Sequence, residues 1–104
     1  MTETIATFGP SLQARVAHAP QLVSADLGGE TAILDPVSGN FYGLNEVGAR
    51  IWELIATPRT LAEVRDTLLE EFDVEVEQCE DDLLTLLHTL HDRRLVVMED
   101  SVDA

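Results

Sequence analysis

Lysine is missing from this 104-residue chain, and its six arginines are outnumbered by twenty aspartates and glutamates. The resulting formal net charge of −14 argues against a nucleic-acid partner, because affinity for phosphate backbones comes from Lys and Arg. The same shortage of positive charge disfavours binding to an anionic membrane surface. The charge instead favours basic or neutral partners and opposes self-association.

Cysteine is almost absent as well. Cys79 is the single one, so no disulfide can form within the chain, which fits a reducing compartment. Residues 1–30 lack the basic start and apolar stretch of a signal peptide. No run approaches the roughly 18 apolar residues that cross a bilayer. We therefore expect a cytoplasmic protein.

The motifs of catalytic and cofactor sites are also missing. The sequence contains no Cys-x-x-Cys, no His-Glu-x-x-His and no glycine-rich phosphate loop. His88 and His91 lie three residues apart on a helical segment, and we interpret them as solvated polar positions rather than metal ligands. Cys79 falls on the apolar stripe of the same segment, where a small buried thiol is ordinary. We expect no enzyme, no cofactor and no metal.

A chain of this length, 45% apolar, has room for one domain with one core. We expect a flexible N-terminus at 1–11, a domain at 12–98 and an acidic tail at 99–104. Short segments of period two, separated by turns rich in Gly and Pro, predict an antiparallel meander in the first half of the domain. Its strands are expected at 22–27, 31–35 and 41–44, with further extended pieces at 12–18 and 95–97.

After Asn45 the apolar period lengthens to about 3.6 residues, which predicts helices. Asn45 is a good N-cap for the first helix, and Thr60 with Glu63 forms a capping box for the second. The three helices are expected at 46–56, 60–73 and 77–93. A three-stranded antiparallel sheet followed by three helices is an α+β domain, and these helix lengths also suit a winged helix-turn-helix arrangement.

Several segments carry a family resemblance: Leu34-Asp35, Gly39-Asn40-Phe41-Tyr42-Gly43-Leu44-Asn45 and Ile51-Trp52, in register with the later helices. They resemble the PqqD family, the peptide-recognition elements of ribosomal peptide natural-product pathways (RiPP recognition elements). The resemblance covers roughly Gln21 to Met98. It implies a winged-helix-like fold of three strands and three helices. It also implies that the leader segment of a precursor peptide binds as an added antiparallel strand, paired with the third strand in a groove against the third helix.

Mapped onto this sequence, the resemblance places the peptide contacts on the third strand and the third helix. The expected contact residues are Asn40, Phe41, Tyr42, Gly43, Leu44, Cys79, Asp82, Leu83 and Leu86. Alternation along the strand puts Tyr42 and Leu44 on one face, as anchors to the core, and leaves Phe41 and Gly43 outward. Asp82 borders the apolar stripe, and it is either an ordinary surface carboxylate or a partner for a basic leader residue.

The resemblance leads us to expect a non-catalytic domain that delivers a precursor peptide to the leader peptidase of a lasso-peptide pathway. A chaperone for a radical-enzyme pathway, such as pyrroloquinoline quinone synthesis, is an alternative. A winged-helix regulator and a structural subunit that binds another protein through a helix face are further alternatives. The exposed strand edge permits a monomer or a dimer paired at Phe41–Leu44.

Overall fold

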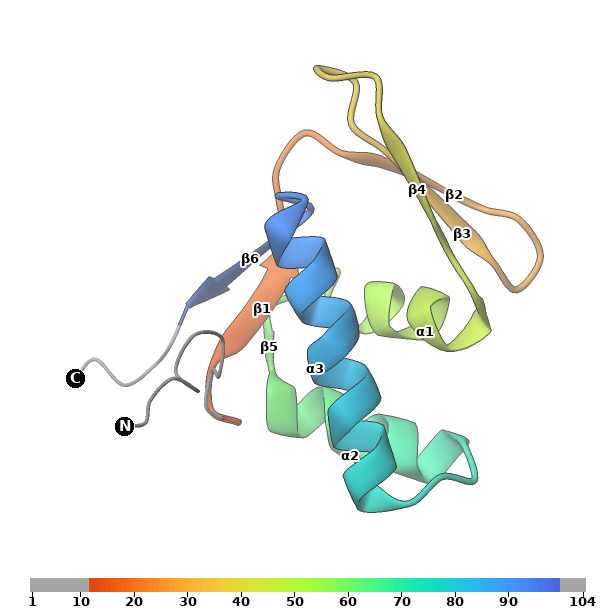
Figure 1. The fold of residues 1–104 in the computed structure, drawn as a ribbon, viewed down its shortest axis with the longest axis vertical. Helices are drawn as coiled ribbons and strands as arrows, with labels where there is room; N and C mark the ends of the chain where they lie inside the picture. The colour runs from red at the N-terminus through yellow and green to blue at the C-terminus, as the bar shows by residue number, and fades with distance from the viewer. Residues whose placement is uncertain (1–11, 100–104) are drawn as a thin grey trace.

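The computed structural model of the chain describes residues 12–99. The expected flexible N-terminus (1–11) and the expected acidic tail from residue 100 onward lie outside the described residues. Figure 1 shows the elements, which are β1 (Arg15–His18), β2 (Val23–Asp26), β3 (Thr31–Leu34), β4 (Phe41–Leu44), α1 (Glu46–Leu54), β5 (Arg59–Thr60), α2 (Leu61–Glu71), α3 (Val76–Asp92) and β6 (Val96–Glu99). The expected α+β class is confirmed.

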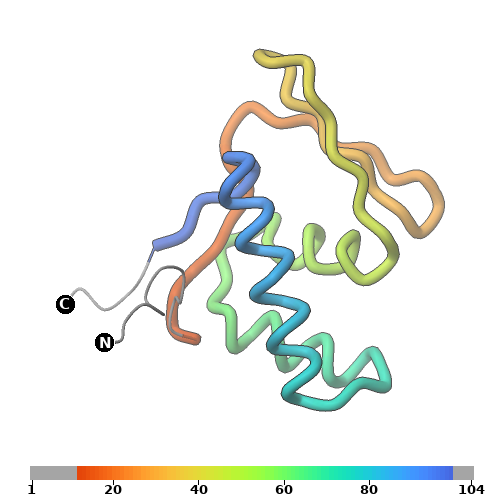
Figure 2. The backbone as a smooth tube through the Cα atoms, in the orientation of Figure 1, coloured from red at the N-terminus to blue at the C-terminus, as the bar shows by residue number. Residues whose placement is uncertain are grey.

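The described strands form two antiparallel sheets of three strands each, in the orders β2-β3-β4 and β5-β1-β6. The first sheet is the expected meander. The second joins the two ends of the domain, since β1 pairs with β6 with Val16 opposite Met98. The extended pieces expected at 12–18 and 95–97 are therefore strands of one sheet. In Figure 2, α3 runs between this sheet on one side and α1 with the meander on the other.

The two hairpin turns of the meander depend on glycines with positive φ. Gly28 and Gly29, at φ of 84° and 100°, form a two-residue turn closed by a 2.7 Å bond from the Leu27 N–H to the Glu30 carbonyl. Both central residues of such a turn need positive φ, which glycine adopts without steric cost. This turn sets the register of β2 against β3.

The second turn, between β3 and β4, contains a glycine bulge. Gly39, at φ of 81°, donates its N–H to the Asp35 carbonyl at 2.8 Å, and the Asp35 N–H donates to the Asn40 carbonyl at 2.9 Å. Two residues therefore oppose one, with glycine in the left-handed position. The bulge fixes the register in which Leu34 lies opposite Phe41.

Side-chain caps begin the first two helices as predicted. The Asn45 Oδ1 accepts a hydrogen bond from the Gly48 N–H at 3.0 Å at the start of α1. The Thr60 hydroxyl accepts from the Glu63 N–H at 3.1 Å, and the Glu63 carboxylate accepts from the Thr60 N–H at 3.0 Å. Both caps satisfy backbone donors that the helix leaves unpaired.

One apolar core is shared by both sheets and all three helices. Leu87 and Leu90 of α3 are fully buried in it, and Trp52 of α1 is 4% exposed. The largest fully buried side chains are Ile33, Ile55, Leu61, Leu83, Leu87, Leu90, Val16 and Val64. Within residues 12–99, no helix combines the length and the apolar character needed to cross a membrane.

His18 of β1 links the second sheet to α1. Its ring stacks on Trp52 with centroids 3.6 Å apart and planes 12° apart, and its Nε2–H donates to the Trp52 carbonyl at 2.7 Å. Burial lowers the pKa of His18 below its usual 6.5, and the hydrogen bond to Trp52 opposes this shift only in part. The neutral imidazole is therefore the form that fits the folded state.

Candidate functional site

The outer side of β4 is open. In the order β2-β3-β4, β4 pairs with β3 only, and no strand of the described part of the chain lies against its other side. In an antiparallel pair, successive residues direct their backbone groups alternately to the neighbour and away from it. The bond from Asp35 to Asn40 fixes the phase of this alternation, so Tyr42 and Leu44 direct their N–H and C=O groups to β3.

Phe41 and Gly43 consequently direct their backbone N–H and C=O groups to the open side. Gly43 adds no side chain there, and a Cβ built at this position would have no heavy atom within 4 Å. Two donors and two acceptors thus lie along an accessible edge. Such an edge is a template for one more strand.

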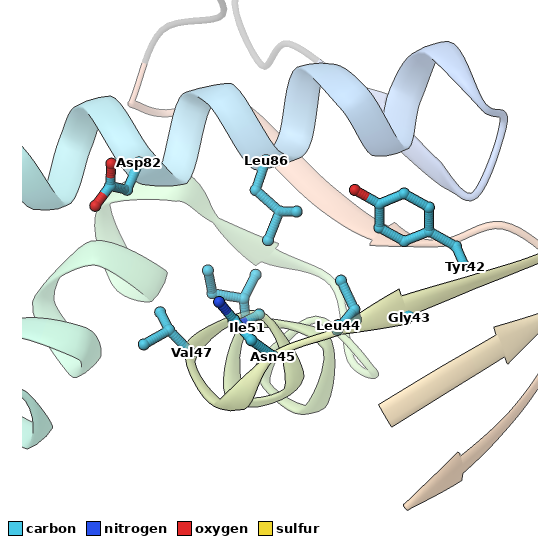
Figure 3. A pocket seen from close by; sticks show the side chains of 9 residues that line it. Tyr42, Gly43, Leu44, Asn45, Val47, Ile51, Asp82 and Leu86 are labelled. Carbon is cyan, nitrogen blue, oxygen red and sulfur yellow. The ribbon is translucent and has the colours of Figure 1, made fainter. Parts of the chain in front are cut away.

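A groove of about 320 Å³ runs beside this edge, between β4, the start of α1 and α3 (Figure 3). Its lining residues are Tyr42, Gly43, Leu44, Asn45, Val47, Gly48, Ile51, Asp82 and Leu86. Figure 3 shows Leu86 pointing from α3 toward Ile51 and Leu44, with Tyr42 at one end and Asp82 at the other. The middle of the groove is therefore apolar and its ends are polar.

The structure brings most of the expected contact residues to this groove. Tyr42, Gly43 and Leu44 line it from the strand, and Asp82 and Leu86 line it from α3. The last two are four residues apart and therefore lie on the same edge of the helix. Because no peptide is present, their contact with one stays a prediction.

Cys79 and Leu83 are placed in the core instead of the groove. They are 4% and 1% exposed, and they border an adjacent apolar pocket of about 90 Å³ between α1, α2 and α3, which shares Val47, Ile51 and Asp82 with the groove. The apolar stripe of α3 is wider than the groove, so one edge of it faces the groove and its centre faces the other helices. Burial raises the pKa of the Cys79 thiol, which keeps it protonated and a poor nucleophile.

Phe41 and Gly43 lie on the outward face of the strand, as the alternation predicted. Phe41 is 71% exposed, whereas Leu44 is 5% exposed on the opposite face. That opposite face, with Tyr42 and Leu44, is the one that borders the groove. The side chain of Phe41 instead lies beside Asn40 and Arg93 around a smaller pocket of about 120 Å³.

Four residues around the start of α1 were not expected at the site: Asn45, Val47, Gly48 and Ile51. Ile51 is 2% exposed, whereas Val47, on the same apolar face of the helix, is 39% exposed and opens to the groove. A Cβ at Gly48 would lie 3.2 Å from the Leu44 Cδ2, so glycine lets α1 pack closely against the end of β4. An apolar period of 3.6 residues places Val47 and Ile51 on the inward side of a helix, but it does not show that a groove remains between them and α3.

The groove is not arranged for metal chemistry. Among residues 12–99, no group of three or more His, Cys, Asp or Glu side chains is placed to hold a metal ion. His88 lies 3.3 Å from the Asp92 carboxylate, one helical turn along α3.

The sequence profile of the PqqD family, described as coenzyme PQQ synthesis protein D, matches residues 30–96. The matched stretch is more than half of the chain, and it includes β3, β4 and all three helices. The chain belongs to the PqqD family. A search of curated proteins gives no match.

Two solved structures resemble this PqqD-family chain. One is described as "TbiB1 in Complex with the TbiA(beta) Leader Peptide"; it is 30% identical, covers 77% of this chain and 93% of its own, and has a TM-score of 0.73. The other, "Lasso peptide synthetase B1 complexed with the leader peptide", is 24% identical, covers 79% and 96%, and has a TM-score of 0.71. The expected family fold is thus confirmed over most of the chain.

Proposed function

We propose that this PqqD-family chain is a non-catalytic cytoplasmic domain that binds the leader segment of a ribosomally made precursor peptide. The observation that carries the proposal is the open edge of β4, where the backbone groups of Phe41 and Gly43 lie beside an apolar groove. A solved structure that is 30% identical to this chain is described as a complex with a leader peptide, which supports the proposal.

Binding occurs by strand addition. An antiparallel leader strand exchanges backbone hydrogen bonds with Phe41 and Gly43, and every second leader side chain enters the groove. There it packs between Leu86 on α3 and the floor made by Leu44 and Ile51. The backbone bonds supply sequence-independent affinity, and the groove selects an apolar side chain at its middle.

The leader is then delivered to a processing enzyme. The leader peptidase of a lasso-peptide pathway is the first candidate, because one similar structure is described as a lasso peptide synthetase B1 with a leader peptide. A radical-enzyme pathway is the second candidate, because the matched family is described by coenzyme PQQ synthesis. Adding this chain to each enzyme with its precursor separates the two. Only the true partner gains turnover on the full precursor, and it gains none on a precursor that lacks the leader.

Calorimetric titration tests the binding step directly. The ligand is the N-terminal segment of a candidate precursor peptide identified among the genes next to the one that encodes this chain, called the cognate leader below. We expect a 1:1 complex with a dissociation constant in the micromolar range or tighter, and no binding to a scrambled leader of equal composition. Equal binding of both peptides would contradict the proposal.

A further inference from the structure

We propose that the groove reads the charge polarity of the leader, with a basic residue bound near Asp82 and an acidic residue bound near Arg93. This inference rests on the proposed strand addition and adds a direction and a spacing to it. The two charges would determine which peptide sequences bind, whereas the edge of β4 requires only that the peptide is extended.

The charges of α3 are separated along its length. The N-terminal end of this segment is acidic, with Glu75, Glu77, Glu80, Asp81 and Asp82. Two arginines, Arg93 and Arg94, follow its C-terminal end, where the carboxylate of Asp92 lies 3.3 Å from the His88 ring. Of these carboxylates, Glu80 is partly neutralised by a 2.7 Å ion pair with Arg65. The helix that forms one wall of the groove therefore carries opposite charges at its two ends.

One charge at each end borders the proposed path of the peptide. Asp82 lines the groove, and the hydrogen bond that it accepts comes from the neutral Gln78 amide at 2.9 Å. Arg93 lies with its guanidinium carbon 5.0 Å from the centre of the Tyr42 ring, and it lines the pocket beside Phe41 together with Asp35. The Gln78 amide does not neutralise Asp82, and the Tyr42 ring does not neutralise Arg93, so both side chains remain suited to a charged ligand.

The geometry also gives the direction of the peptide. β4 begins at the Arg93 end and finishes near Asp82, so it runs opposite to α3. A strand added antiparallel to β4 then runs parallel to α3. Its N-terminal part lies near Asp82, and its C-terminal part lies near Arg93.

The distance between the two charges gives their spacing in the peptide. Arg93, the C-cap of α3, follows Asp82 by eleven positions, which is about 16 Å along the helix axis. An extended strand advances about 3.4 Å per residue, so this length corresponds to about five residues. Both peptide side chains must point to the side of the added strand that faces α3, which requires an even spacing of about four or six residues.

A reversed charge order is penalised at both ends, because an acidic residue then meets Asp82 and a basic one meets Arg93. Like charges placed together discriminate more strongly than one lost attraction. The net charge of −14 alone favours basic peptides without regard to order. The order of the two signs is therefore the property that distinguishes this proposal from general attraction.

A selection experiment with random peptides tests the proposal for any leader sequence. Random 14-residue peptides displayed on phage are selected on the unaltered chain, on the exchange variant D82R/R93E and on the control variant D81R/R94E. The control exchanges the same kinds of charge at the adjacent positions, Asp81 and Arg94, which line neither the groove nor the pocket beside Phe41. Circular dichroism checks that each variant is folded, and the single variants D82N and R93Q replace the exchange variant if it is not.

We expect the unaltered chain and the control to select a Lys or Arg followed four or six residues later by an Asp or Glu. The exchange variant should select the opposite order. A selected peptide should bind the unaltered chain at least tenfold more tightly than its charge-reversed isomer, and each single variant should reduce this ratio several-fold.

NMR of the selected complexes separates the two ways in which the proposal can fail. Binders that shift the amides of Phe41 and Gly43 but show no charge order would overturn the polarity proposal and leave the strand-addition site standing. Binders that leave those amides unmoved would overturn the site as well.

Discussion

Replacing Gly43 with proline removes one backbone donor from the open side of β4 and puts a ring where an added strand would pass. The donor at this position points away from β3, so the meander loses no hydrogen bond of its own. Proline is tolerated in edge strands where its missing N–H would face solvent. We therefore expect G43P to fold, with a free energy of unfolding within about 1 kcal/mol of the unaltered chain.

Binding should fall much further than stability. The missing N–H removes one bond to the leader, and the ring hinders the adjacent bond at the neighbouring carbonyl. At about 1 kcal/mol of net stabilisation for each bond, the loss is about 2 kcal/mol, which corresponds to roughly 30-fold weaker binding. Fluorescence anisotropy with a labelled cognate leader measures this ratio.

Ser24 of β2 offers a matched control on the other edge of the same sheet. The bond from Leu27 to Glu30 fixes the alternation of β2, and it directs the N–H of Ser24 away from β3. S24P should therefore bind the leader as the unaltered chain does. If G43P bound within threefold of the unaltered chain, or if S24P lost as much affinity, the assignment of the leader to β4 would be refuted.

Three further predictions concern the groove wall, a buried histidine and a helix cap. L86A should weaken leader binding by about 1–2 kcal/mol because an apolar contact is lost, whereas L84A, on another face of α3, should leave anisotropy titrations unchanged. Burial lowers the pKa of His18, so the unfolded chain takes up a proton at a higher pH than the folded chain, and the free energy of unfolding should fall as the pH drops below 6.5. In urea unfolding, H18F should therefore lose less stability between pH 7 and pH 5 than the unaltered chain. An equal loss would exclude His18 as a source of the pH dependence. T60A should cost about 1 kcal/mol in the same unfolding assay at pH 7, because the cap of α2 is removed.

Local structure was predictable because its causes lie a few residues apart. The turn at Gly28–Gly29, the cap at Asn45 and the capping box at Thr60 each depend on side chains or φ angles within one turn. The alternation of Phe41 and Tyr42 across β4 followed from the geometry of any strand. These features do not depend on the tertiary fold.

The second sheet and the division of α3 were not predictable in the same way. Val16 pairs with Met98 across most of the chain, and no local pattern specifies such a partner. Cys79 and Leu86 both belong to the apolar side of α3, and only the positions of α1 and α2 decide that Leu86 borders a groove while Cys79 is buried. The predicted contact residues therefore lie on two elements that border the groove, β4 and α3, but their boundary on α3 differs from that of the groove.

Hydrogen exchange measured by NMR, with and without saturating cognate leader, tests strand addition most directly. Strand addition predicts that the amides of Phe41 and Gly43 exchange much more slowly in the complex, because they become bonded to the leader, while those of Ser24 and Asp26 on the outer side of β2 keep their rates. Unchanged exchange at Phe41 and Gly43 in a saturated complex, or protection of Ser24 and Asp26 in their place, would contradict it.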